Sequence, residues 1–259
     1  MTKYLNEFFF DKESPRKWYV IGVATSCYSS SDGAICFRSQ HRDLVRIVMD
    51  ALESGHTLSE DPREKSSYWF GAMGCDYLIG RLASYGLDRP RNKRRFPDVP
   101  EQYLDDFVRG VIDARANIHV SNGRTTIYLR GNRNFLLGLN KSLRRHAGVE
   151  RDKPFDGRLT YLHSDAKKIY DFLYRNFDSI QKDGIYLPSK KKLYATAPIP
   201  NYAGQRLAAR INVAKKRVLE GKSTRDAASK AGYSTVAAFY RAFKTATGQT
   251  LKEWKTERV

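Results

Sequence analysis

The sequence predicts an α+β domain followed by a small all-α domain. Three observations lead to this expectation. The first part of the chain holds two similar runs, each an apolar helical segment with an internal glycine followed by strand-like alternation. Asn122-Gly123 lies between two alternating segments, which is a strong hairpin signal. The last part holds two short helical segments around a glycine, and a hydrophobic content of 41% in 259 residues is enough for a core.

The two similar runs define an internal repeat. Residues 19–28 resemble residues 107–116, with Gly22 and Gly110 at corresponding places. Each repeat is expected to follow the order αββαββα. The pattern places strands at 34–38, 68–73, 117–120, 125–130 and 158–163, and further helices at 42–52, 75–85, 132–146 and 165–176.

Alternation within the strands predicts which side chains face the helices. In the first repeat Ile35 and Phe37 should point inward, and Cys36 and Arg38 outward. In the second repeat the inward residues should be Thr125, Ile127 and Leu129, and the outward residues Thr126, Tyr128 and Arg130.

This double pattern, together with residues 170–174, resembles the LAGLIDADG homing-endonuclease family over residues 15–195. The resemblance implies two pseudo-symmetric halves whose helices meet at Gly22 and Gly110, where a missing side chain allows close approach. It also implies that the two sheets form a saddle over the DNA major groove. The DNA contacts that follow from it are Arg38, Arg124, Thr126, Tyr128 and Arg130.

The resemblance does not extend to the cutting chemistry. The family uses two acidic residues, one at the base of each signature helix, to hold divalent metals that activate water. The corresponding positions here are Cys27 and Arg115, and neither is a ligand for a hard cation. Two carboxylates remain as candidates for residual nuclease chemistry, Asp32 and Asp113, although Asp113 is expected to point away from the helix contact. We therefore expect no enzyme, no metal site and no cofactor, with Arg115 close to the DNA phosphates.

The last 37 residues, from Ser223, predict a helix, a glycine turn and a second helix. Ser223 and Ser234 are suitable helix caps, and Gly232 can adopt the left-handed conformation that ends a helix. Phe239 and Phe243 are four residues apart and should share the buried face. Together with Gly232-Tyr233, Arg241, Lys244 and Thr247-Gly248, they resemble the second helix-turn-helix of AraC-type transcription regulators. We expect base contacts from Thr235, Val236, Ala237, Tyr240 and Arg241, and a phosphate contact from Lys244.

Composition points to the same class of partner. The formal net charge is +18, and residues 204–259 hold 13 Lys and Arg against 4 Asp and Glu, a net of +9. A charge of this size favours a polyanion. No run of 18 apolar residues predicts a membrane span, and three cysteines without a CxxC spacing argue against a zinc site or a disulfide framework. The five histidines show no HExxH pattern, and no phosphate-binding or nucleophile motif is present.

The predicted organisation has three parts. Residues 1–183 form the LAGLIDADG-like domain, with halves at about 15–98 and 99–183. Residues 184–203 form a basic linker that contains two prolines, and residues 204–259 form the AraC-like helix-turn-helix domain. Within the linker we expect Lys190, Lys191 and Lys192 to contact phosphate.

These observations together predict a sequence-specific, double-stranded-DNA-binding transcription regulator that has lost endonuclease activity. It resembles bacterial sporulation regulators that join a degenerate LAGLIDADG domain to a helix-turn-helix. We expect a cytoplasmic, nucleoid-associated monomer, a pseudo-dimer by its repeat, with DNA and RNA polymerase as partners and no membrane contact. Three alternatives stay open: an active metal-dependent homing endonuclease using Asp32 and Asp113, an RNA-binding intron maturase-like factor, and a nonspecific architectural DNA binder.

Overall fold

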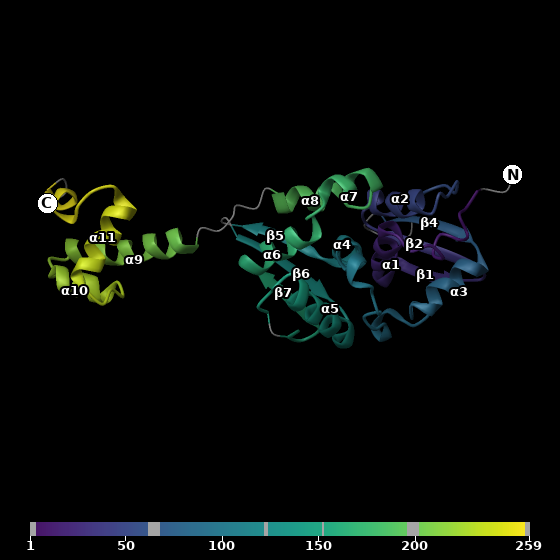
Figure 1. The fold of residues 1–259 in the computed structure, drawn as a ribbon, viewed down its shortest axis with the longest axis horizontal. Coiled ribbons are helices and arrows are strands. Elements are labelled where there is room, and N and C mark those ends of the chain that lie inside the picture. The colour runs from purple at the N-terminus through teal and green to yellow at the C-terminus, as the bar shows by residue number, and fades with distance from the viewer. Residues whose placement is uncertain (1–3, 62–67, 122–123, 152, 196–201, 257–259) are drawn as a thin grey trace. The chain divides into compact units, whose positions relative to one another are not determined.

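The chain forms two compact units, Met1–Pro198 and Ile199–Val259, in a computed structural model. The structure describes residues 4–61, 68–121, 124–151, 153–195 and 202–256 (Figure 1). The first unit is a mixed α+β structure with two antiparallel sheets, and the second is all helical. No helix within the described ranges combines the length and the apolar character that a membrane crossing needs.

Two helices, α1 (Pro15–Cys27) and α4 (Leu104–Arg115), pack directly against each other at the centre of the first unit. Helix α1 begins where the hydroxyl of Ser14 accepts a hydrogen bond from the Lys17 amide, and Pro15 occupies its first position. The two helices cross at Gly22 and Gly110. A Cβ at Gly22 would lie 2.2 Å from the Phe107 carbonyl oxygen, and one at Gly110 would lie 2.1 Å from the Tyr19 carbonyl oxygen. The crossing therefore has room only for glycine at both positions.

The first sheet contains β1 (Tyr28–Ser31), β2 (Ala34–Ser39), β3 (Ser59–Asp61) and β4 (Tyr68–Gly74), in the order β1-β2-β4-β3. Asp32 and Gly33 connect β1 to β2 with φ values of 50° and 73°, the two left-handed residues of a tight hairpin turn. Helices α2 (Arg42–Ala51) and α3 (Asp76–Ser84) complete the first repeat. Short 3-10 turns, η1 (Arg91–Lys93) and η2 (Glu101–Tyr103), lead to α4.

The second sheet contains β5 (Asn117–Ser121), β6 (Arg124–Arg130) and β7 (Arg158–Leu162), in the order β5-β6-β7, with α5 (Arg133–His146) and α6 (Ser164–Leu173). The predicted hairpin residues Asn122-Gly123 lie outside the described residues. Among the described residues this repeat has three strands, whereas the sequence predicted four. Before β7, the described residues form only an isolated bridge from Phe155 to Arg158, and Pro154 beside it has no amide hydrogen for a strand ladder.

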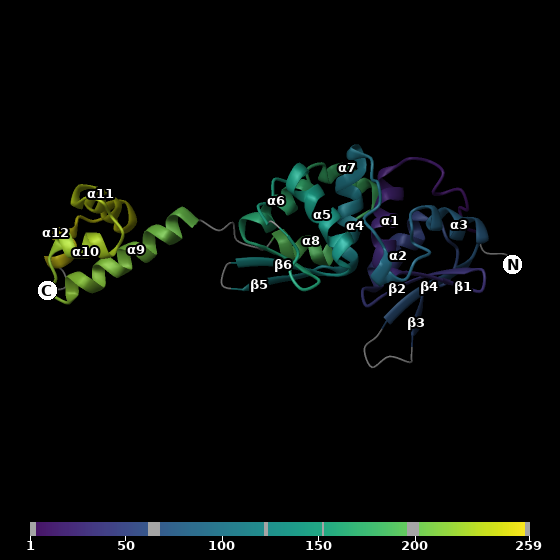
Figure 2. The same ribbon diagram turned by 90° about the horizontal axis from the view of Figure 1, so that it is seen from below.

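Helices cover one face of each sheet. Figure 2 shows the strands of the two sheets along one side of the first unit and the helices on the other side. Ile35, Phe37, Ile127 and Leu129 are fully buried beneath the helices, and the residues between them are more exposed. The opposite face of each sheet is therefore the polar one.

Part of the predicted linker is folded. Helices α7 (Phe177–Asp183) and α8 (Pro188–Ala195) follow α6, and Ile185 and Leu187 between them are buried in the core of the first unit. The expectation of an extended segment over 184–203 is thus wrong for residues 188–195. Ile185 and Leu187 bury their side chains in a turn, and Pro188 at the first position of α8 favours the start of a helix.

The second unit contains α9 (Tyr202–Leu219), α10 (Thr224–Lys230), α11 (Val236–Thr247) and α12 (Leu251–Thr256). Its separate core lies between all four helices. The members are Ile211, Ala214, Val218, Ala227, Ala228, Ala231, Phe239, Phe243, Leu251 and Trp254.

Candidate nucleic-acid interface

Helices α10 and α11 are joined by a tight turn. The hydroxyl of Ser223 accepts a hydrogen bond from the Asp226 amide and begins α10. The helix ends at Ala231, and Gly232 follows with a φ of 77°, in the left-handed region that favours glycine. The Tyr233 amide then donates back to the Ala228 carbonyl oxygen. These contacts fix the direction in which the chain enters α11.

Helix α9 holds this turn from the other side through Arg210. Its Nε donates to the Ala231 carbonyl oxygen at 2.7 Å, and a second guanidinium nitrogen donates to the Gly232 carbonyl oxygen. The same guanidinium lies over the Tyr233 ring. Arg210 therefore satisfies backbone acceptors that the end of α10 leaves open.

The buried face of α11 fixes which residues it exposes. Phe239 and Phe243 are fully buried, and the Phe243 ring packs edge-on against Trp254 with 5.7 Å between centroids. The opposite face carries residues at spacings of three and four, namely Ala237, Tyr240, Arg241 and Lys244, and all four are exposed. The result is a helix held rigidly by its core, with a basic and aromatic face in solvent.

The start of α11 differs from the expectation. Thr235, and not Ser234, caps the helix, because the Thr235 hydroxyl accepts from the Ala238 amide at 3.1 Å. Val236 is half-buried and packs on the core of the second unit. The Thr235 oxygen is thus already used by the backbone, and Val236 offers only part of its surface.

The outer face of the second sheet gathers the side chains that the alternation predicted for β6. Arg124 and Arg130 are exposed and Tyr128 is half-buried on that face. Thr126 is an exception, because it is only 8% exposed on the central strand, between the cross-strand neighbours His119 and Leu162. Its expected role as an exposed contact is wrong, since flanking side chains cover it.

Arg158, on β7, was not predicted as a site residue. The register of the sheet pairs Arg130 with Arg158, so two exposed arginines lie side by side at one edge of this face. Predicting the pair requires the alignment of β6 with β7, which the intervening 27 residues do not specify.

In the first sheet Arg38 has an internal partner. Its guanidinium lies 3.2 Å from the buried carboxylate of Asp61 and 4.4 Å from the centre of the Tyr68 ring. The side chain remains one-third exposed on the outer face. It contributes less net charge there than its residue type suggests.

The three lysines at the middle of α8 differ in their burial. Lys190 is buried, and its Nζ donates to the carbonyl oxygens of Ile112, Asp113 and Ala116 at 2.7–2.8 Å. Burial lowers the pKa of Lys190 to about 8. Lys191 is half-buried, with its Nζ 3.6 Å from the Phe177 ring centre, and Lys192 is exposed. The expected hydrogen bond from Lys190 to phosphate is wrong, because all three hydrogens of its ammonium group are donated to carbonyl oxygens at the end of α4.

Cys27 and Arg115, at the ends of α1 and α4, lie beside a common polar cavity. Arg115 donates to the Ser26 hydroxyl at 2.6 Å and to the Thr25 carbonyl oxygen at 3.2 Å, and it stacks on Phe135. Burial lowers the pKa of Arg115 to about 10 and raises the pKa of the Cys27 thiol to about 11. At neutral pH the position therefore combines a cation with a neutral thiol.

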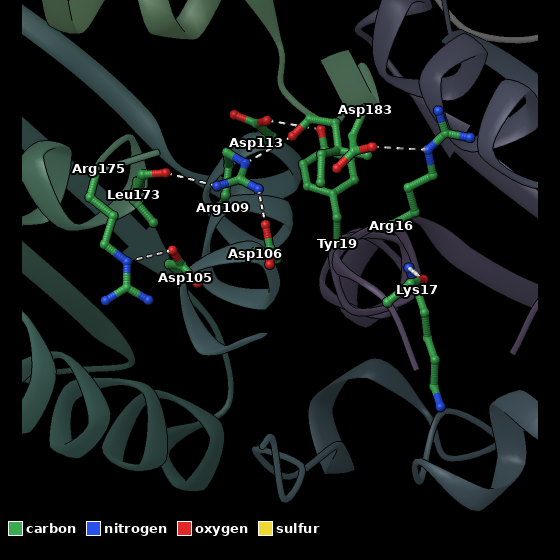
Figure 3. A network of polar contacts seen from close by, with 12 residues as sticks. Arg16, Lys17, Tyr19, Asp105, Asp106, Arg109, Asp113, Leu173, Arg175 and Asp183 are labelled. Atoms are coloured by element: carbon green, nitrogen blue, oxygen red, sulfur yellow. Dashed lines mark hydrogen bonds and ion pairs between the residues drawn. The ribbon is translucent and has the colours of Figure 1, made fainter. Parts of the chain in front are cut away.

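The two residual carboxylates are not together. Asp113 is fully buried, where it accepts from the Tyr19 hydroxyl and the Leu187 amide, each at 2.9 Å (Figure 3). Asp32 lies in the exposed hairpin turn between β1 and β2. The expectation that Asp113 points away from the helix contact is wrong, since its partner Tyr19 belongs to α1. Burial raises the pKa of Asp113 to about 6.

Arg109, on the same helix as Asp113, is also fully buried. It donates to the Leu173 and Ile185 carbonyl oxygens and to the Asp106 carboxylate (Figure 3). This network ties α4 to the segment before α8 and is structural. In the ranges that the structure describes, no group of three or more His, Cys, Asp or Glu is arranged to hold a metal ion.

No protein-family model and no curated protein sequence matches this chain. Among solved structures, the chain is similar to full-length DUF199/WhiA from Thermatoga maritima, with 15% sequence identity and a TM-score of 0.41. The similarity covers 93% of this chain and 94% of that one. The identification of the chain as a LAGLIDADG domain fused to an AraC-type module is therefore wrong: no model of either family matches, and the similar structure is of a DUF199/WhiA protein.

Proposed function

We propose that this protein is a sequence-specific regulator that binds duplex DNA and places α11 in the major groove. The observation that carries the proposal is the exposed face of α11, with Ala237, Tyr240, Arg241 and Lys244 held in place by the buried Phe239 and Phe243. A helix fixed after a tight turn, with its first residues free to approach base edges, is the arrangement of helix-turn-helix proteins. The net charge of +18 supplies the attraction to a polyanion.

The residues of α11 divide by chemistry. Arg241 can form the paired hydrogen bonds to guanine O6 and N7 that discriminate this base. Tyr240 and Ala237 offer aromatic and methyl surface to neighbouring bases, for example to the thymine methyl group. Lys244 lies one turn further along, where a point charge suits a phosphate.

A second contact is proposed for the outer face of the sheet β5-β6-β7. Arg124, Arg130 and Arg158 are exposed around Tyr128 on that face. Since half of the net charge lies outside residues 204–259, contacts to phosphate from both units would add affinity without adding sequence information. They would also make binding strongly dependent on salt.

Strand cleavage is not part of the proposal. Two-metal hydrolysis needs carboxylates that share an accessible site. Here Asp113 is buried and bonded to Tyr19 and Leu187, and Asp32 lies in a hairpin turn. Arg115 at the end of α4 would repel a divalent cation.

The test compares Arg241→Ala with Lys216→Ala. Lys216 is exposed on α9 and is a control for the loss of one positive charge. Binding is measured to a selected duplex and to a random duplex at several salt concentrations. The proposal predicts that Arg241→Ala weakens binding to the selected duplex by about 10- to 100-fold, from a loss of about 1–3 kcal/mol, and random binding by far less. Equal losses on both duplexes, or tighter binding to structured RNA than to duplex DNA at equal salt, would contradict it.

A further inference from the structure

A cavity of about 260 Å³ lies where α1 and α4 end. Arg38, Arg91, Arg115 and Lys190 line it, and no Asp or Glu does. These four cations come from four different elements, β2, η1, α4 and α8. Ser39 and His41 add polar side chains to the same wall. The cavity thus collects positive charge from several directions.

Most of the partners of these cations do not neutralise them. Lys190 donates only to three backbone carbonyl oxygens, and Arg115 donates to a hydroxyl and a carbonyl oxygen. These dipoles orient the charges and leave them positive. Among the described residues, Asp61 pairs with Arg38, the charge of Asp113 acts on Lys190, and the charge of Asp43 acts on His41 in the cavity wall. Asp61 and Asp113 each offset part of the charge of one of the four cations.

The position of Arg91 is built into the fold. Arg94, three residues further, is buried and donates to the carbonyl oxygens of Ala24, Thr25 and Tyr28 at the end of α1. It also donates to Leu87 and Arg89 in its own loop. This anchor holds the loop that carries Arg91 against the mouth of the cavity.

We propose that this cavity binds a phosphate group. A single carboxylate is satisfied by one planar arginine fork. Here the guanidinium groups of Arg38, Arg91 and Arg115 converge from three elements and match the oxygens of a tetrahedral anion. The Lys190 ammonium adds positive charge to the wall, although its three hydrogens are donated to backbone oxygens. The phosphate has two sources that share this chemistry, a free phosphate or phosphate monoester and the backbone of bound DNA. The first source is independent of the proposed function, and only the second rests on it.

Two variants of the same loop test the site. Arg91→Gln removes a lining cation, and Arg95→Gln removes an exposed cation of the same loop that does not line the cavity. Binding of inorganic phosphate to the full chain is measured by titration calorimetry at pH 7, against chloride at equal ionic strength. We expect saturable binding of one phosphate, weakened about tenfold by Arg91→Gln, which corresponds to about 1.4 kcal/mol, and within about twofold of wild type for Arg95→Gln.

Binding of a random duplex DNA by the same three proteins separates the two sources. If phosphate comes from the backbone, Arg91→Gln weakens DNA binding more than Arg95→Gln does, and free phosphate competes. If the ligand is free phosphate, phosphate binding is saturable and weakened by Arg91→Gln, whereas Arg91→Gln and Arg95→Gln bind DNA with equal affinity. The inference is overturned if wild type shows no saturable phosphate binding and both variants lose DNA affinity equally. That result would leave the Arg241 test unaffected, since it concerns the other unit.

Discussion

The guanidinium carbon of Arg210 lies 3.7 Å from the centre of the Tyr233 ring, so α9 holds the turn between α10 and α11 directly. The same side chain donates to the two carbonyl oxygens that follow α10. One residue therefore combines a cation–π contact with the capping of a helix end. The orientation of α11, and with it the proposed base-reading face, therefore depends on α9, a helix outside the α10–α11 pair.

Arg210→Ala should destabilise the second unit by about 2 kcal/mol, because the stacking and the two hydrogen bonds are lost together. The free energy of unfolding, followed by circular dichroism in urea, checks this. Lys216→Ala on the same helix serves as the control and should change stability by less than about 0.5 kcal/mol. Equal effects of the two substitutions would show that Arg210 does not hold the turn.

Thr235→Ala should cost about 1 kcal/mol of stability, because the Ala238 amide loses its partner. Ser234→Ala removes a hydroxyl from the preceding, exposed residue and should cost much less. The two variants differ only in which hydroxyl is deleted. A larger loss for Ser234→Ala would mean that the cap is wrongly placed.

Gly22→Ala or Gly110→Ala should prevent the close packing of α1 and α4. The added Cβ would lie 2.2 Å or 2.1 Å from a backbone oxygen, and a backbone oxygen cannot rotate away. We expect a loss of about 3 kcal/mol or more, or no folded protein. Gly80→Ala, in the exposed part of α3 where an added Cβ meets nothing within 4 Å, is the matched control. It should stabilise the protein by about 0.5–1 kcal/mol, and similar melting temperatures for all three would refute the packing argument.

Asp113→Asn should change the pH dependence of stability. Burial raises the pKa of Asp113 from 3.8 to about 6 in the folded protein, so the folded state binds more protons than the unfolded state between these values. This group therefore stabilises the fold at low pH, and its contribution is lost as the pH rises from about 4 to about 6.

The amide of the Asn variant can still accept from Tyr19 and Leu187, but it does not ionise. Between about pH 4 and pH 6, the unfolding free energy of wild type should therefore fall by about 2 kcal/mol relative to that of Asp113→Asn. Burial also raises the pKa of Asp106 to about 6, so Asp106 contributes a pH dependence of the same sign to the unfolding free energy of both proteins. Parallel curves of unfolding free energy against pH for the two proteins would show that Asp113 does not titrate there.

The sequence predicted those elements whose patterns are local. The alternation in β2 and β6 and the glycine-centred helices α1 and α4 are visible in any short window of the sequence. Helix α8 was not predicted, because its run of three lysines looks like a solvated segment in the sequence. Lys190 can be buried there only because the fold brings three carbonyl oxygens at the end of α4 to its ammonium group. Likewise β3, with three residues, is specified by its pairing to β4 and not by its own composition.

The candidate site shows the same division. The exposed face of α11 follows from the spacing of Phe239 and Phe243, so Tyr240, Arg241 and Lys244 could be placed from the sequence. Thr126 looked equally exposed, yet its cross-strand neighbours cover it. The cavity that we propose binds phosphate is lined by residues from position 26 to position 190, and only the fold brings them together.

The central claim is that α11 reads a DNA sequence, and selection of bound duplexes from a random library tests it most directly. The full chain is used with magnesium present, and the recovered DNA is sequenced and checked for strand breaks. The account predicts one enriched motif, recovered intact by wild type and lost by Arg241→Ala. A library that remains random after selection, or DNA recovered with cuts at a defined position, would contradict it.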